Sequence, residues 1–316
     1  MDIRELASLA ELESFEPEWR RLWTRDPRAT LFQSPDWLLP WTRHLWGGGR
    51  LRVLTLRSQG RLCALAPFFE WGIGARCLSF LGSGISDYLD ILAEPDCAQP
   101  AARLIFEWLA SECAHCQTID LQELPPGSPL LAGAGPPWQE EASGVCPVVT
   151  LPGTVPPDVR RAERKLAREA SVAFRQAVLL DELFHLHRAR WRERHDEGVL
   201  ATASLEAFHR ESAGRFLAAG MLRIFGLFAN GQCIAVQYNF SAKRRTFAYL
   251  SGFDPAWSRY SPGAVLLKYS MERAIQEGSL EFDFLRRPEP FKYLWGARDR
   301  ANRRLMLTHS IRAEVA

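Results

Sequence analysis

Apolar and polar side chains alternate in several short segments of the first half of the chain, and a period of two is typical of strands. It predicts a strand at residues 51–57, and the segment 61–71 after the tight turn S-Q-G is expected as its hairpin partner. Further strands are expected at 76–83, 88–95 and 118–125. In other segments the apolar residues recur every three or four positions, which is the spacing of one helix face. It predicts helices at residues 1–23, 35–46 and 98–114.

The second half repeats this order of elements. The pattern predicts helices at residues 158–170, 181–197 and 204–219, followed by three antiparallel strands within residues 221–254. It then predicts a helix at 264–277, a strand at 280–285, a short helix at 291–295 and a last strand from residue 303 onward. A segment rich in proline and glycine, residues 125–158, separates the halves. We therefore predict an α+β protein with domains at residues 1–150 and 158–316, each a mostly antiparallel sheet flanked by helices.

The composition is that of a globular protein, with 47% hydrophobic and 24% charged residues in 316. No run of 18 apolar residues occurs, so we expect no membrane span. The acidic N-terminal segment lacks the basic start and apolar centre of a signal peptide, and a cytoplasmic location is expected. The oligomeric state is left open by the sequence.

Seven cysteines are present, and two of them, Cys113 and Cys116, form a C-x-x-C pair that encloses His115. A zinc site of the usual kind needs a second pair, and the sequence has none. We therefore expect free, partly buried thiols and no bound metal.

Charge is divided unevenly along the chain. Residues 1–157 carry 12 basic and 19 acidic side chains, whereas residues 158–316 carry 27 and 18. This asymmetry indicates that the second half binds an anion. The alternative is that the charges serve only packing between the halves.

One candidate anion site lies where a predicted strand ends near Ser251 and a helix starts near Pro262. The first turn of a helix offers unpaired backbone N–H groups to an anion. Gly263 and Ala264 allow close approach to the backbone, and Arg259 lies just upstream. The alternative is an ordinary helix start with Ser261 as its N-cap.

Three segments carry a family resemblance: FQSPDWLLPW at residues 32–41, GSGISDYLDILAEP at 82–95, and the run from YLSGFDPAWSRYSPG to FKYLWG at 249–296. Together they resemble acetyltransferases of the CelD/BioF2 type in the GNAT superfamily. These are related to the Fem peptidoglycan ligases, which carry two tandem GNAT-like units. The resemblance spans most of the chain and implies an acyltransferase with two such units.

The resemblance also implies a donor site. GNAT enzymes hold the pyrophosphate of acyl-CoA on a Q/R-x-x-G-x-G/A loop, which implies binding by four residues here: Arg259, Ser261, Gly263 and Ala264. Pro262 replaces the central glycine and has no N–H to donate. The donor is accordingly acetyl-CoA or another acyl-CoA, an aminoacyl-tRNA as in the Fem ligases, or none in a binding module without catalysis. The first half lacks the loop and is expected to line the cleft.

Acyl transfer needs a base, a group that stabilises the oxyanion and an acid for the leaving group. Asp283 is the candidate base, the alternative being an outward-facing polar position in a strand. Tyr249 is the candidate acid, the alternative being a half-buried strand aromatic. Lys292 follows Phe291 where Fem-type relatives keep a lysine, so the resemblance implies a cation for a phosphate or the oxyanion.

The acceptor is the least defined partner. The acidic cluster of Asp87, Tyr88 and Asp90 is the candidate for holding a cationic or hydroxyl-rich molecule, the alternative being polar residues at a strand edge. Phe291 and Trp295 flank Lys292 and are assigned to the same substrate. The resemblance implies a small-molecule, saccharide or cell-envelope acceptor and a role in polysaccharide biosynthesis.

Overall fold

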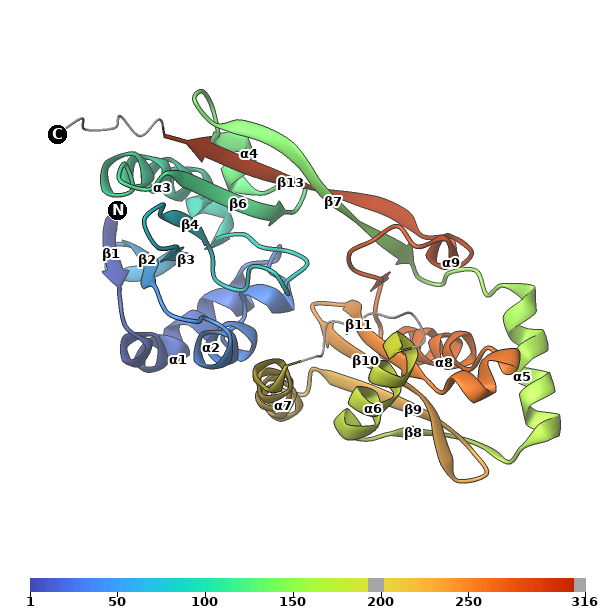
Figure 1. Ribbon diagram of the computed structural model, residues 1–316. Helices are drawn as coiled ribbons and strands as arrows, with labels where there is room; N and C mark the ends of the chain where they lie inside the picture. Colours follow the sequence, from blue (N-terminus) through green and yellow to red (C-terminus); the bar gives the residue numbers. More distant parts are fainter. Residues whose placement is uncertain (193–201, 310–316) are drawn as a thin grey trace. The chain divides into compact units, whose positions relative to one another are not determined.

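The computed structural model describes residues 1–192 and 202–309 (Figure 1). The chain forms two compact units, unit 1 with Met1–Gly144 and Arg300–Ala316, and unit 2 with Val145–Asp299. Each is a mixed α+β unit whose mainly antiparallel sheet is flanked by helices, which confirms the predicted fold class. Among the described residues, no helix combines the length and apolarity needed to cross a bilayer.

Unit 1 places two helices before its hairpin of long strands and a third helix before its last strands. Its elements are β1 (Asp2–Leu6), α1 (Leu9–Arg25), η1 (Leu31–Gln33), α2 (Pro35–His44), β2 (Arg50–Ser58), β3 (Arg61–Trp71), β4 (Cys77–Phe80), β5 (Leu92–Ala93), η2 (Pro95–Cys97), α3 (Ala98–Glu112), β6 (Thr118–Leu124), α4 (Pro129–Gly133), the first half of β7 (Gln139–Thr150) and β13 (Arg298–Thr308).

The strands of unit 1 follow the order β1-β2-β3-β4-β6-β13, in which β4 and β6 run parallel and the other neighbours pair antiparallel. A single apolar cluster fills the space between this sheet and α3, where Ile105 and Leu109 contact side chains such as Phe68 and Phe80. Strands β2 and β3 are buried almost continuously, on both faces of the sheet, whereas the alternation in the β2 sequence predicts only one buried face.

Two predictions for unit 1 were wrong in detail. The start of the predicted N-terminal helix is a strand, since Asp2–Leu6 pairs antiparallel with β2. Helix α1 begins only after Ser8, which forms a capping box with Glu11. The predicted strand at 88–95 is mostly loop and keeps only the two residues of β5.

Unit 2 repeats the order of unit 1. Its elements are the second half of β7, α5 (Pro157–Glu169), β8 (Val172–Gln176), α6 (Leu180–Arg192), α7 (Ala203–Ala218), β9 (Leu222–Ala229), β10 (Gln232–Ala242), β11 (Arg245–Phe253), η3 (Pro255–Tyr260), α8 (Pro262–Gln276), β12 (Glu281–Asp283) and α9 (Pro290–Tyr293). The end of the helix predicted at 181–197 lies outside the described residues. Strand β8 was not predicted.

The strands of unit 2 follow the order β8-β9-β10-β11-β12-β7, with β11 and β12 parallel. In each sheet, the last strand in this order is far in sequence from the strand with which it pairs. Val148–Thr150 of β7 pairs with β12 in unit 2, and β13 pairs with β6 in unit 1. The units thus differ at both ends from the predicted domains at 1–150 and 158–316.

Candidate functional site

A strongly basic pocket lies on unit 2 between α5 and η3. Its volume is about 440 Å³, and five of its seven lining residues are basic: Arg161, Arg164, Lys165, Arg168 and Arg259. The remaining two are Asp158 and Ala162. Such a concentration of cations around one hollow favours an anionic ligand.

The amphipathic pattern of α5 creates this pocket. Val159 and Leu166 are buried, and Leu166 packs into the cluster that contains Tyr260 and Leu266. An ion pair of 3.2 Å between Lys268 and Glu163 also ties α8 to α5. With its apolar face fixed, α5 presents its basic side chains outward.

Not all of these charges are neutralised by the protein. Arg161 pairs with Asp158 at 2.9 Å, and Arg259 lies 3.8 Å from Glu169. Within the described part of the chain, Arg164 and Arg168 have no ion-pair partner. Two cations of the pocket are therefore available to a ligand.

The start of α8 offers fewer donors than the sequence predicted. Ser261 caps the helix with φ +47° and makes no side-chain capping bond. The N–H groups of Ala264 and Val265 both donate to the Ser261 carbonyl, at 3.0 and 3.1 Å. Because Pro262 has no N–H, Gly263 keeps the one N–H of this turn without a backbone partner among the described residues.

The pairing of β11 with β12 ends early, and the stretch of the β11 edge beyond it is called the β11–β12 opening. The two strands pair only where Arg245–Phe247 meets Glu281–Asp283, whereas β11 continues to Phe253. A bulge at Tyr249 bends β11 there, since Tyr238 faces Leu250 and the next residue faces Ala248. Beyond Phe247 the edge of β11 is not paired with β12, so an extended ligand can add along it.

Tyr249 lies at this opening, half-buried beside an aromatic cluster. Its ring centroid is 5.6 Å from His209 and 6.0 Å from both Tyr238 and Phe240. Burial lowers the pKa of His209 to about 3 and raises that of Tyr238, so His209 stays neutral and Tyr238 keeps its proton. Of the two tyrosines in this cluster, Tyr249 is partly exposed, whereas Tyr238 is fully buried.

Asp283 and Lys292 meet at the loop that follows β12. The buried Asp283 carboxylate accepts a hydrogen bond of 2.8 Å from the Leu285 N–H. The Lys292 ammonium contacts four carbonyl oxygens at 2.8–3.1 Å, those of residues 284–287, and Glu289 at 2.7 Å. Leu285 and Arg287 both have positive φ, a costly conformation for residues with side chains.

The structure thus gives Lys292 a set of ligands that the sequence did not predict. Its side chain is only 6% exposed, and backbone carbonyls surround the ammonium. Of its predicted neighbours, Trp295 is buried in the core of unit 2 with Phe282 and Phe284, while Phe291 is 47% exposed. Their roles toward a substrate stay predictions.

The predicted acceptor cluster lies in the interior of unit 1. Asp87, Tyr88 and Asp90 are each at most 6% exposed. The Asp90 carboxyl accepts hydrogen bonds of 2.8 Å from the Ser128 hydroxyl and the Ile91 N–H. Burial raises the pKa of Asp90 to about 7. These contacts fix a loop, and an acceptor role for the cluster stays a prediction.

Comparisons with known proteins agree with this architecture. Residues 157–293, which include the basic pocket and the β11–β12 opening, match the model of an acetyltransferase (GNAT) domain. FemX superposes with a TM-score of 0.69 at 9% identity, over 96% of this chain and 97% of FemX. Residues 157–293 thus match a GNAT domain, and the chain as a whole shares the fold of FemX. No match to a curated protein was found.

Two further structures share this fold over nearly the whole chain. The structure of L-PGS from Bacillus licheniformis has a TM-score of 0.61 at 14% identity, over 99% of this chain and 96% of its own. A tandem GNAT protein from the clavulanic acid biosynthesis pathway has a TM-score of 0.55 at 14% identity, over 97% and 98%. At these identities the likeness concerns the fold.

Sequence reasoning singled out Arg259 but missed the cations of α5 that share its pocket. The signal was present in the segment RRAERKLAR, residues 160–168, where basic side chains recur on the face opposite Val159 and Leu166. What the sequence could not supply is the packing of α5 beside η3, which brings Arg259 to that face.

Proposed function

We propose that this protein is an acyltransferase whose donor carries the acyl group on a phosphate-bearing carrier, acetyl-CoA or another acyl-CoA, and whose acceptor is an amine or hydroxyl. The observation that carries the proposal is the basic pocket within the GNAT domain. The phosphates of CoA are the kind of anion that five basic side chains attract.

The beginning of α8 and the β11 edge complete the proposed donor site. Arg259 and the Gly263 N–H are the expected pyrophosphate contacts, with Ser261 and Ala264 shaping the turn. The amide-bearing arm of CoA would pair with the open edge of β11 beyond Phe247. This arrangement directs the thioester toward the bulge at Tyr249.

The proposed chemistry divides among three side chains. Tyr249 donates a proton to the leaving thiolate, because it stands at the bulge of β11 and is only partly buried. Asp283 is the proposed base, although its bond to the Leu285 N–H equally suits a role in shaping the loop. Lys292 is proposed to act through the loop at residues 284–287, whose carbonyls it gathers, rather than by touching the donor.

The FemX-like fold favours a second candidate donor. The resemblance to Fem ligases implies aminoacyl-tRNA, and a basic helix such as α5 also suits an RNA backbone. A saccharide or cell-envelope acceptor, and a cytoplasmic location, rest on the sequence expectations alone.

Isothermal titration of the full chain with CoA and with charged tRNA tests the donor. We expect CoA to bind, and the double variant Arg164→Glu/Arg168→Glu to lose at least about tenfold in affinity, since two cation–phosphate contacts are reversed. The matched control is Arg160→Glu, an exposed position of α5 outside the pocket, which should bind CoA like wild type.

The outcomes distinguish the three hypotheses about the donor. Tight, salt-dependent binding of charged tRNA without CoA binding would replace the acyl-CoA proposal by the Fem-like one. If neither CoA nor charged tRNA binds, the protein is a binding module that has no acyl donor. Release of free CoA thiol from acetyl-CoA in the presence of an amine or sugar acceptor, lost in Tyr249→Phe, would establish transfer.

A further inference from the structure

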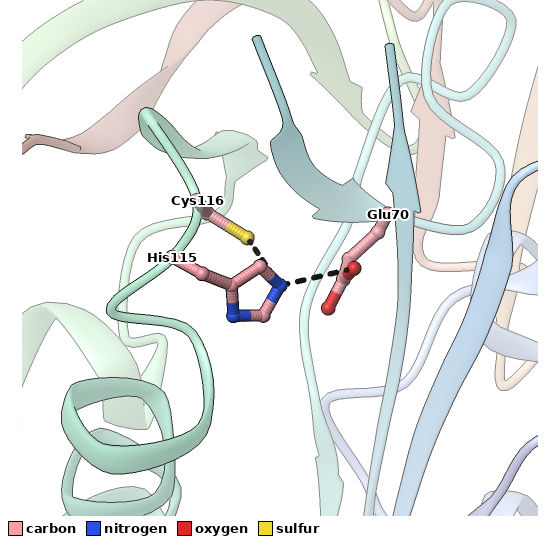
Figure 2. A group of neighbouring side chains, drawn as sticks. All are labelled: Glu70, His115 and Cys116. Atoms are coloured by element: carbon pink, nitrogen blue, oxygen red, sulfur yellow. Dashed lines mark hydrogen bonds and ion pairs between the residues drawn. The ribbon is translucent and has the colours of Figure 1, made fainter. Parts of the chain in front are cut away.

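Four side chains that the acyltransferase proposal does not use come together in unit 1. Glu70 lies at the end of β3, and the other three lie between α3 and β6: Cys113, His115 and Cys116. One ligand atom each of Glu70, His115 and Cys116 lies within 4.8 Å of the others. Figure 2 shows the three side chains pointing toward one another from these separate segments.

The spacing of these atoms matches a tetrahedral metal site. His115 Nε2 lies 3.3 Å from Glu70 Oε2 and 3.7 Å from Cys116 Sγ. Zinc binds nitrogen and carboxylate oxygen at about 2.0–2.2 Å and thiolate sulfur at about 2.3 Å, so tetrahedral neighbours lie about 3.3–3.6 Å apart. The three ligands therefore need little rearrangement to close around an ion.

Cys113 lies outside this group of three but beside Cys116, and its thiol would complete the set once its side chain turns toward the other ligand atoms. Its thiol is hydrogen-bonded to that of Cys116, and the Cys116 N–H donates to the Cys113 carbonyl at 3.0 Å. Both cysteines are fully buried. The resulting set of two sulfurs, one nitrogen and one oxygen is typical of a zinc-type, borderline-soft divalent cation.

The surroundings hold these side chains and balance the charge. The buried Arg52 guanidinium hydrogen-bonds the other oxygen of Glu70, leaving Oε2 directed at His115. Two thiolates and one carboxylate carry three negative charges, which a divalent ion and Arg52 offset. His115 is 42% exposed and provides an entry path, and the exposed Arg76, 3.6 Å from Oε2, can move aside.

We propose that these four side chains form a zinc site that joins the end of β3 to the α3–β6 connection: Glu70, Cys113, His115 and Cys116. The sequence predicted no metal because a second C-x-x-C pair is missing. The structure brings in Glu70, 43 residues before Cys113, through the placement of β3. The site is independent of the acyl donor, whose pocket belongs to unit 2.

Metal titration of the reduced, chelator-treated full chain tests the site. Zinc is expected to bind with one-to-one stoichiometry and to raise the melting temperature. Cobalt in place of zinc should give the visible bands of a tetrahedral ion and a thiolate charge-transfer band. His115→Ala, at an exposed position, should weaken binding by about 100-fold or more, since even an outer-sphere partner costs about 10- to 100-fold.

Two variants complete the design. Cys116→Ser should abolish the thiolate band, whereas Cys233→Ser, a free cysteine of unit 2, should leave both band and affinity unchanged. An octahedral cobalt spectrum without a thiolate band, or unchanged zinc affinity in His115→Ala, would overturn the proposal. So would a Cys113–Cys116 disulfide that forms in the presence of equimolar zinc, because it would identify the pair as a redox couple instead.

Discussion

The Lys292 ammonium lies 2.8 Å from the carbonyl oxygen of Arg287, a residue with φ +83°. The same ammonium holds the carbonyl of Leu285, which also has positive φ. A buried cation thus stabilises a loop that its own backbone conformation disfavours. The loop follows β12, beside the opening where acyl transfer is proposed.

Lys292→Met should destabilise this loop, because it leaves four carbonyl oxygens without their cation. We expect a loss of about 2–3 kcal/mol in the free energy of unfolding, measured in urea. Tyr293→Phe is the matched control, since it removes one exposed hydrogen bond to Asp299 and should change stability by less than about 0.5 kcal/mol. Equal stability of the two variants would show that the ammonium does not hold the loop.

The buried carboxyl of Asp90 should make stability depend on pH. Its pKa is raised by burial from 3.8 to about 7. Below pH 3.8 the carboxyl is protonated in both states and its contribution is fully present. As the pH rises toward 7, the unfolded chain ionises while the folded one keeps the proton, so stability is lost.

Asp90→Asn should remove this dependence, since an amide still accepts the Ser128 hydroxyl bond and never ionises. Denaturation at about pH 4 and about pH 8 should show the variant gaining on wild type at the higher pH. Glu11→Gln is a control of opposite sign, because hydrogen bonds from the N–H of Ala7 and from Ser8 lower the pKa of Glu11. Parallel pH profiles of Asp90→Asn and wild type would contradict the assignment.

Sequence periodicity was sufficient for long elements and failed for short ones. Strand β2 alternates apolar and polar side chains along most of its length, and β3 carries a continuous apolar run from Leu62 to Phe69. The short strands β1 and β8 have five residues each and are largely exposed, so their pairing rather than their side chains makes them strands. Local pattern does not contain that pairing information.

Long-range contacts also limited prediction of the candidate sites. Arg259 could be named from a motif, but its cationic partners on α5 depend on packing. The sequence identified Lys292 as a candidate cation. It did not predict that backbone carbonyls would surround the ammonium, because that arrangement depends on the positive φ of Leu285 and Arg287. Glu70 gave no local signal at all, because its partner His115 comes from another strand connection.

Unit 1 takes β13 from the part of the chain that follows unit 2, which predicts where a mutation in that strand acts. Leu305 of β13 is fully buried in the core of unit 1. Leu305→Ala should cost about 2–5 kcal/mol and reduce hydrogen-exchange protection in β6, its pairing partner. Leu294→Ala, at a side chain of unit 2 that is 65% exposed, should have little effect. Lost protection in β12 with β6 unchanged would contradict the strand assignment.

The packing of α6 on β11 predicts opposite effects for two glycine substitutions in unit 2. A Cβ at Gly252 would lie 2.9 Å from the His187 backbone nitrogen and 3.0 Å from Leu186 Cβ. Gly252→Ala should therefore push α6 from the strand and cost about 1–3 kcal/mol. Gly214 faces open space within α7, so Gly214→Ala should stabilise by about 0.5–1 kcal/mol through helix propensity. Thermal denaturation of both variants measures the difference, and a neutral Gly252→Ala would mean that α6 does not pack this closely.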